Sequence, residues 1–309
     1  MLALSITSSC NFHCKTCLRE YPIQGNHIPV DLLEKALKEA RKLQIGRVAI
    51  TGGEPCLHPE FEKIVETIVK NGFLFGLVSN GSMPEKYEFL IEKYGDRILY
   101  ISFSLDGATE DIHDYIRQPG SFTKVLDSVK FFSSRGIPTG VGVCLNKVNM
   151  HQIESIFQLA KNLGAQRIFF MGTIKTSHNG NIILSDEERK MCRSRIAALD
   201  KKHNIFIKTT SSLGSRGGVE FCLALNLDGI TINPKGEVSF CCDNVGDGAI
   251  VGSLKNHSFY ELYSKCLDLS CQLKKKRVEM LKAGKTMEGF NTCEFCNTFL
   301  EKCIKRPSR

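Results

Sequence analysis

Three cysteines lie close together near the start of the chain: Cys10, Cys14 and Cys17. Each can supply a thiolate, a soft ligand that suits zinc, copper(I) or an iron–sulfur cluster. Together they can bind three iron atoms of a [4Fe-4S] cluster and leave the fourth iron open, whereas a zinc site normally takes a fourth protein ligand. The spacing therefore favours a cluster with one open iron over three buried or zinc-bound thiols.

A second group of cysteines lies toward the C-terminus. Four of them could ligate one further [4Fe-4S] cluster, with Cys303 as a possible substitute ligand, and a structural zinc on the same thiolates is the alternative. The four are Cys222, Cys241, Cys293 and Cys296. The chain has 14 cysteines and no secretion signal, and a reducing cytosol keeps thiols reduced, so metal binding is favoured over disulfides.

Composition narrows the class of protein. A length of 309 residues suggests about two domains, and 42% hydrophobic with 24% charged residues excludes extensive disorder. No stretch of 18 apolar residues occurs, and the apolar start is too short for a signal peptide, so we expect a cytoplasmic protein with no membrane partner. The net charge of +8 is spread along the chain; its densest run, 274–277, reads as a solvated helix face and gives no reason to expect nucleic acid.

Apolar runs and helix-period segments alternate over the first half of the chain, which is the pattern of parallel α/β folds. Asp31 can cap the first helix. The predicted strands are 2–6, 47–51, 74–79, 98–104, 139–145 and 167–172. The predicted helices are 31–43, 59–70, 83–94, 122–134 and 152–163.

The pattern weakens after the sixth strand. Residues 173–221 are expected to form a connector with one charged helix at 186–198. A β-hairpin (229–233 and 237–241) and a helix at 259–266 follow. We therefore predict two domains, an α/β core over 1–205 and a smaller Cys-rich α+β domain over 206–309.

Polar motifs stand where the predicted strands end, the position at which parallel α/β folds place their chemistry. After the second strand, glycines permit a close backbone approach and Glu54 offers an acceptor. Arg117, beyond the fourth strand, can pair with a carboxylate; the alternative is that it is an exposed helix arginine without a functional role. The motif residues are Gly52, Gly53, Glu54 and Pro55, then Asn80, Ser104, Asp106, Arg117 and Asn146.

The cysteine spacing, with Phe12 inside the loop, and the Gly-Gly-Glu-Pro motif together resemble the radical S-adenosylmethionine (SAM) family. The resemblance implies a partial (β/α)6 TIM-type barrel and SAM held on the open iron. It also implies that the Gly-Gly-Glu segment contacts the SAM amino group and that Ser104 and Arg117 hold its carboxylate. Phe12, Pro55, Asn80 and Asp106 join the cofactor-binding candidates, and Asn146 is a candidate for the ribose hydroxyls.

The C-terminal cysteines resemble the auxiliary-cluster region of the same family, called twitch with one cluster and SPASM with two. The seven-cysteine SPASM pattern is incomplete, since no cysteine follows Cys303. One auxiliary [4Fe-4S] cluster is expected. The roles of Cys242, Cys266 and Cys271 stay open.

The resemblance implies reductive cleavage of SAM to a 5′-deoxyadenosyl radical and hydrogen abstraction from a substrate, by an oxidoreductase or epimerase. We expect modification of a ribosomal peptide or protein by crosslinking, epimerisation or oxidation, with a small natural product such as an aminoglycoside as the alternative substrate. An iron–sulfur electron carrier or scaffold without catalysis is a third interpretation. A flavodoxin- or ferredoxin-type reductant is the expected partner. An epimerase needs a hydrogen donor, for which Cys144 and Cys242 are candidates, with burial as small core residues the alternative.

Overall fold

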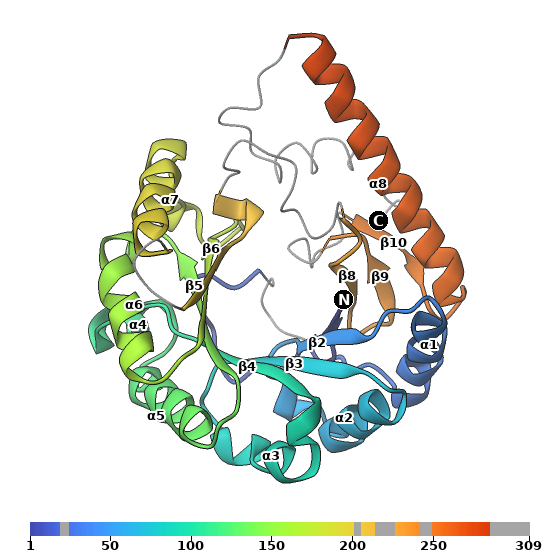
Figure 1. Cartoon of the computed structure of the whole chain (residues 1–309), viewed down its shortest axis with the longest axis horizontal. Coiled ribbons are helices and arrows are strands. Elements are labelled where there is room, and N and C mark those ends of the chain that lie inside the picture. Colours follow the sequence, from blue (N-terminus) through green and yellow to red (C-terminus); the bar gives the residue numbers. More distant parts are fainter. Residues whose placement is uncertain (19–24, 201–204, 214–225, 242–248, 285–309) are drawn as a thin grey trace. The chain divides into compact units, whose positions relative to one another are not determined.

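Strands and helices alternate over the first half of the chain, as the sequence predicts (Figure 1). The strands are β1 (Leu2–Ser5), β2 (Arg47–Thr51), β3 (Leu74–Ser79), β4 (Ile98–Ser104), β5 (Thr139–Leu145), β6 (Arg167–Gly172), β7 (Phe206–Thr209), β8 (Ile230–Ile232), β9 (Glu237–Ser239) and β10 (Ile250–Ser253). The helices are α1 (Val30–Lys42), α2 (Phe61–Lys70), α3 (Phe89–Tyr94), α4 (Glu110–Ile116), α5 (Ser121–Ser134), α6 (Ile153–Asn162), α7 (Asp186–Asp200) and α8 (Phe259–Lys282).

The computed structural model describes residues 1–18, 25–200, 205–213, 226–241 and 249–284. The chain forms two units. The first comprises Met1–Cys10, Tyr21–Phe75 and Ser215–Arg309, and the second comprises Asn11–Glu20 and Gly76–Gly214. The expected boundary between 205 and 206 stays a prediction.

In the first unit, β1 is the central strand, with β2 on one side and β8 on the other, both parallel to it. The hairpin expected at 229–241 is confirmed as β8 and β9, which pair antiparallel, and β10 continues the sheet. Helix α1 contacts α2 and α8, and its buried residues include Leu33 and Leu37. This arrangement places the carboxyl ends of β1 and β2 side by side.

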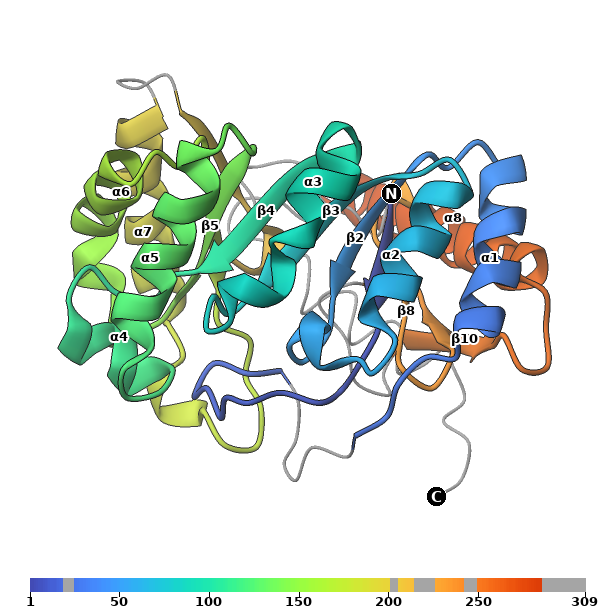
Figure 2. The ribbon, with the colours of Figure 1, turned by 90° about the horizontal axis from the view of Figure 1, so that it is seen from below.

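In the second unit, β4, β5, β6 and β7 follow one another as parallel neighbours. Figures 1 and 2 show α4 to α7 along one face of these strands. On that face Phe103 packs on Phe132 of α5, with ring centroids 5.5 Å apart, and both are fully buried. Because side chains alternate along a strand, Ser104 and Cys144 lie on the opposite face, where both are partly exposed. The parallel α/β fold expected from the sequence is confirmed.

Three local expectations were wrong. Asp31 does not cap α1: the N-cap is Pro29, and Asp31 stands in the first turn, where its charge suits the helix dipole. The expected connector contains a further strand, β7, parallel to β6. The last helix, expected at 259–266, continues to Lys282 after a capping box formed by Ser258 and Glu261.

The basic run falls in the extension of α8. Its three lysines are exposed as expected, but Arg277 is buried. In the part of the chain that the structure describes, no helix is both long and apolar enough to cross a membrane.

Candidate functional site

The turn after β2 lies against the chain that leaves β1. The Gly53 backbone N–H donates to the Thr7 carbonyl at 2.7 Å, and the Glu54 N–H donates to the Ser9 carbonyl at 2.8 Å. Gly52 has φ of +151°, and a Cβ there would lie 2.6 Å from the Thr7 carbonyl oxygen. Only glycine therefore fits this position.

Glu54 is buried within the same turn. The Cys56 thiol donates to its Oε1 over 3.9 Å, and Pro55, also buried, begins the short turn Pro55–Leu57. A carboxylate removed from water interacts strongly with a cation placed beside it. The structure thus gives the Gly-Gly-Glu segment a fixed backbone and a buried acidic group.

The cysteine loop runs from the first unit, which contains Cys10, into the second, which contains Cys14 and Cys17. None of the three is in a disulfide; Cys14 is buried and the other two are partly exposed. The Lys15 N–H donates to the carbonyl of Ile116, the last residue of α4, at 2.8 Å. Among the described residues, no three His, Cys, Asp or Glu side chains gather around a point that would hold a single metal ion.

The start of this loop is joined to the end of β3. The side-chain Nδ2 of Asn80 donates to Asn11 Oδ1 at 2.8 Å, and Asn11 Nδ2 donates to Ser82 Oγ at 2.9 Å. Phe12 is buried beside them in the chain. Of the two predicted candidates here, Asn80 therefore fixes the loop through a hydrogen bond, and Phe12 is a buried residue of the loop.

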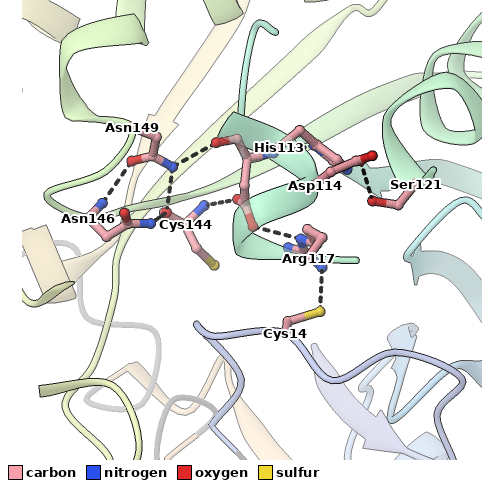
Figure 3. Close-up of polar contacts among 9 residues, drawn as sticks. Cys14, His113, Asp114, Arg117, Ser121, Cys144, Asn146 and Asn149 are labelled. Atoms are coloured by element: carbon pink, nitrogen blue, oxygen red, sulfur yellow. Dashed lines mark hydrogen bonds and ion pairs between the residues drawn. The ribbon is translucent and has the colours of Figure 1, made fainter. Parts of the chain in front are cut away.

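An ion pair joins Asp106 and Arg117 beside the loop (Figure 3). Arg117 Nε donates to Asp106 Oδ2 at 2.6 Å, and Arg117 Nη1 donates to the Cys14 sulfur at 3.8 Å. The Asp106 side chain is fully buried, and that of Arg117 is 11% exposed, so the surface alternative for Arg117 was wrong. Burial alone would lower the pKa of Arg117, but the negative charge of Asp106 raises it above its usual value, and the guanidinium stays charged.

Asp106 is held at every polar atom. Its Oδ1 accepts from the Cys144 backbone N–H at 2.6 Å, its carbonyl accepts from Asn149 Nδ2 at 2.9 Å, and its N–H donates to His113 Nδ1 at 3.2 Å. These contacts tie the end of β4 to the end of β5 and to α4. The carboxylate that holds Arg117 therefore has little freedom to turn.

Asn146 is used within its own turn. Its Nδ2 donates to the Cys144 carbonyl and its Oδ1 accepts from the Val148 N–H, both at 2.9 Å. Its backbone N–H donates to Asn149 Oδ1 at 2.8 Å. These bonds give Asn146 a structural role, and its expected contact with a ribose stays a prediction.

His113, Asp114 and Asn149 support the site but were not among the predicted site residues. Asp114 accepts hydrogen bonds from the Ser121 hydroxyl (3.0 Å) and the Phe122 N–H (2.8 Å), so it joins α4 to α5. His113 is fully buried, and burial together with the nearby Arg117 lowers its pKa to about 4. In the sequence, the one signal that could have indicated this cluster is that His113 and Arg117 follow closely after Ser104-Leu105-Asp106-Gly107.

The Cys144 thiol projects from the end of β5 on the side away from Asn149 (Figure 3). Burial and the Asp106 carboxylate raise the pKa of this thiol to about 12. The group is therefore a neutral S–H at pH 7. Such a thiol can give up a hydrogen atom, which is the role considered for it from the sequence.

Of the predicted auxiliary-cluster ligands, only Cys241 is described. It follows β9, is partly exposed, and its N–H donates to Ser239 Oγ at 3.4 Å. Outside the described residues lie Cys222, Cys242, Cys293, Cys296 and Cys303. Cys266 is buried and Cys271 exposed on α8.

The first half of the chain, which contains the cysteine loop and the Gly-Gly-Glu-Pro segment, is similar to a known protein family. Residues 4–160 match the sequence profile of the Radical SAM superfamily. The AdoMet-dependent heme synthase of Methanosarcina barkeri is 27% identical over 178 residues, 55% of this chain and 50% of that protein. The antilisterial bacteriocin subtilosin biosynthesis protein AlbA of Bacillus subtilis is 27% identical over 164 residues, 52% of this chain and 36% of AlbA. The chain thus spans half or less of these two relatives.

Among solved structures, Streptococcus suis SuiB bound to its precursor peptide SuiA has a TM-score of 0.70 at 13% identity. The match covers 85% of this chain and 64% of SuiB. A likeness at that identity concerns the fold alone. It agrees with the α/β architecture described above.

Proposed function

Because the chain belongs to the radical SAM superfamily, we propose that it cleaves SAM reductively to a 5′-deoxyadenosyl radical, which abstracts a hydrogen atom from the substrate. The observation that carries the proposal is the placement of Cys14. The cysteine loop puts this buried thiol beside Arg117, a cation fixed by Asp106 near the carboxyl ends of parallel strands. That end of the strands is where α/β folds place their chemistry.

The thiols of the loop fit a [4Fe-4S] cluster by number and chemistry. Cys10, Cys14 and Cys17 would each bind a different iron atom, so they need not meet at one point. When bound, the cluster would supply the electron that cleaves SAM and an open iron for the amine and carboxylate of SAM. The protein's part is to fix the loop, which it does through the Lys15 and Asn11 hydrogen bonds.

We assign the SAM contacts to two groups of residues. The Gly52–Gly53 backbone and the Glu54 carboxylate would receive the amino group, which is supported by the close approach at Gly52 and the burial of Glu54. Arg117 would receive the carboxylate, assisted by Ser104. Arg117 is suited to this because its Nη2 makes no hydrogen bond to any described residue, while Nε and Nη1 hold it in place.

We propose a ribosomal peptide or protein as the substrate, which is oxidised, crosslinked or epimerised. AlbA is a bacteriocin biosynthesis protein, and SuiB binds a precursor peptide. The partly exposed face of β4 and β5 that bears Ser104 and Cys144 is the surface on which we place the reacting residue. Because another relative is a heme synthase, the substrate screen also includes small molecules.

The test is anaerobic. The protein is reconstituted with iron and sulfide, mixed with SAM and dithionite, and assayed for 5′-deoxyadenosine, alongside Cys14→Ala and a matched control, Cys192→Ala, which removes a buried thiol in α7. We expect activity in the wild type and in Cys192→Ala, and none in Cys14→Ala. No 5′-deoxyadenosine from a wild-type protein with a verified cluster and bound SAM would contradict the proposal.

The substrate class has its own readout. Deuterated ribosomal peptides and deuterated aminosugars are added separately, and mass spectrometry follows transfer of deuterium into 5′-deoxyadenosine. Transfer from peptides supports the peptide assignment, and transfer from aminosugars alone contradicts it.

We also propose one auxiliary cluster in the C-terminal cysteines and a cytoplasmic flavodoxin- or ferredoxin-type donor. Two four-iron clusters require about eight iron and eight sulfide per chain. A content of about four of each would remove the auxiliary cluster.

A further inference from the structure

The Arg117 guanidinium donates to two acceptors at once, the Asp106 carboxylate and the sulfur of Cys14 (Figure 3). We propose that Arg117 raises the reduction potential of the cluster bound by the loop through its contact with Cys14, and that Asp106 is the positioning residue that holds it there. This inference rests on the proposed function, because it requires the cluster to be present.

The contact between Arg117 and Cys14 is held in place by the bond of Arg117 to Asp106. Arg117 approaches Asp106 with Nε and Cys14 with Nη1, so one planar group spans both partners. Asp106 cannot turn away without losing its bond to the Cys144 N–H. The guanidinium therefore keeps a defined position toward the sulfur.

The loop is fixed to the same helix end. The Lys15 N–H donates to the Ile116 carbonyl, one residue before Arg117, and the Lys15 ammonium lies 4.3 Å from the ring centroid of Tyr115. Two neighbours in the loop, Cys14 and Lys15, thus contact three consecutive residues at the end of α4. The thiol and the guanidinium are held by one short segment, independently of any bound group.

The sign of the effect follows from charge. Reduction adds one electron to the cluster, and a cation that donates a hydrogen bond to a ligating sulfur stabilises the more negative state. Because the site is largely shielded from solvent, the interaction is weakly screened. Arg117 should make the cluster easier to reduce, in addition to receiving the SAM carboxylate through Nη2.

The experiment is a redox titration of the reconstituted holoenzyme followed by electron paramagnetic resonance. The SAM-binding cluster is identified by the change that SAM causes in its signal. The variants are Arg117→Gln, Asp106→Asn and the double variant. Arg195→Gln is the matched control, because Arg195, on α7, also pairs with a carboxylate, Glu154, and its other hydrogen bonds go to the Met150 and His151 carbonyls rather than to the loop.

We expect Arg117→Gln to lower the reduced-to-oxidised ratio at the wild-type midpoint about tenfold, equivalent to about 59 mV for one electron. Arg195→Gln should leave the ratio unchanged. In the Asp106→Asn background, Arg117→Gln should have a much smaller effect, because the guanidinium is no longer held at the sulfur. The cycle cancels the direct effect of the Asp106 charge on the cluster.

An unchanged midpoint potential in Arg117→Gln with an intact cluster overturns the tuning role. If Arg117→Gln shifts the potential equally in the wild-type and Asp106→Asn backgrounds, the positioning role of Asp106 is overturned. If Asp106→Asn does not fold, Arg117→Lys decides: its single nitrogen cannot span both partners, so its potential should fall below that of the wild type. A wild-type potential in Arg117→Lys contradicts positioning. A wild-type protein with no SAM-responsive cluster signal contradicts the proposed function instead.

Discussion

Asp106 and Cys144 stand at the ends of the neighbouring strands β4 and β5 and are joined by a hydrogen bond of 2.6 Å from the Cys144 backbone N–H to Asp106 Oδ1. The same carboxylate holds Arg117 through its other oxygen. A single buried side chain thus sets the relative positions of a thiol, a cation and two strand ends. Changes at Asp106 should therefore affect both stability and chemistry.

Asp106→Ala should reduce the free energy of unfolding by about 3–5 kcal/mol, because it leaves the buried Arg117 cation without its carboxylate. Anaerobic urea denaturation of the holoenzyme measures this. Glu154→Ala, which breaks the more exposed pair with Arg195, should cost about 1 kcal/mol or less. Equal losses in the two variants would contradict the importance given to the buried pair.

His113 should make stability depend on pH. Its pKa is about 4 when folded, because the ring is buried beside Arg117, and about 6.5 when unfolded. Below pH 6.5 the unfolded chain binds a proton that the folded chain does not, so stability is fully present above pH 6.5 and is lost as the pH falls toward 4.

Between pH 7.5 and 5.5 this loss should amount to about 1.4 kcal/mol, measured by urea denaturation. His113→Gln removes the titrating group and should show a smaller change over the same range. Parallel curves for the two proteins would mean that His113 does not titrate as its burial requires.

The strands were predictable because each is a short apolar run bounded by polar or turn residues. The predicted bounds of β2 (Arg47–Thr51) and β5 (Thr139–Leu145) agree with the structure. Strand β7 was not predictable, because four residues in a polar stretch carry little periodic signal and gain their place by pairing with β6. The length of α8 was missed because its charged second half hides the buried Leu273 and Arg277.

The site was predictable as far as strand ends and motif residues define it. That Arg117 would contact Cys14 could not be predicted, since it depends on how α4 ends beside the cysteine loop. The role of Asn149 could not be predicted either: its side-chain amide donates hydrogen bonds to the carbonyls of both Asp106 and Cys144 and so joins two strand ends. Such contacts between distant residues leave no pattern in a single sequence.

Gly52→Ala should destabilise the protein by about 1–3 kcal/mol and weaken SAM binding, because the backbone is left-handed there and a Cβ would meet the Thr7 carbonyl. Calorimetry with SAM and urea denaturation measure the two effects. Gly95→Ala is the matched control, since Gly95 has helical angles and a Cβ added there would have nothing within 4 Å. It should be neutral or slightly stabilising. Equal behaviour of the two variants would contradict a special role for the turn.

Among the residues that the structure describes, Cys144 is the candidate for returning a hydrogen atom to the substrate in a redox-neutral epimerisation. The 5′-deoxyadenosyl radical takes a hydrogen atom from the substrate, and the substrate radical would take one from the Cys144 S–H on the other face. One electron from the reductant and one proton would then restore the thiol. Cys242, which lies outside the described residues, is the second candidate.

Cys144→Ala and Cys242→Ala separate these roles. Loss of the donor should lower product yield at least about tenfold while 5′-deoxyadenosine formation stays within about twofold of the wild type. In D2O the wild-type product should carry one deuterium at the inverted carbon, since the thiol proton exchanges with solvent. Full product yield from both variants, with deuterium still incorporated, would exclude a cysteine donor at either position and assign the returned hydrogen atom to another group.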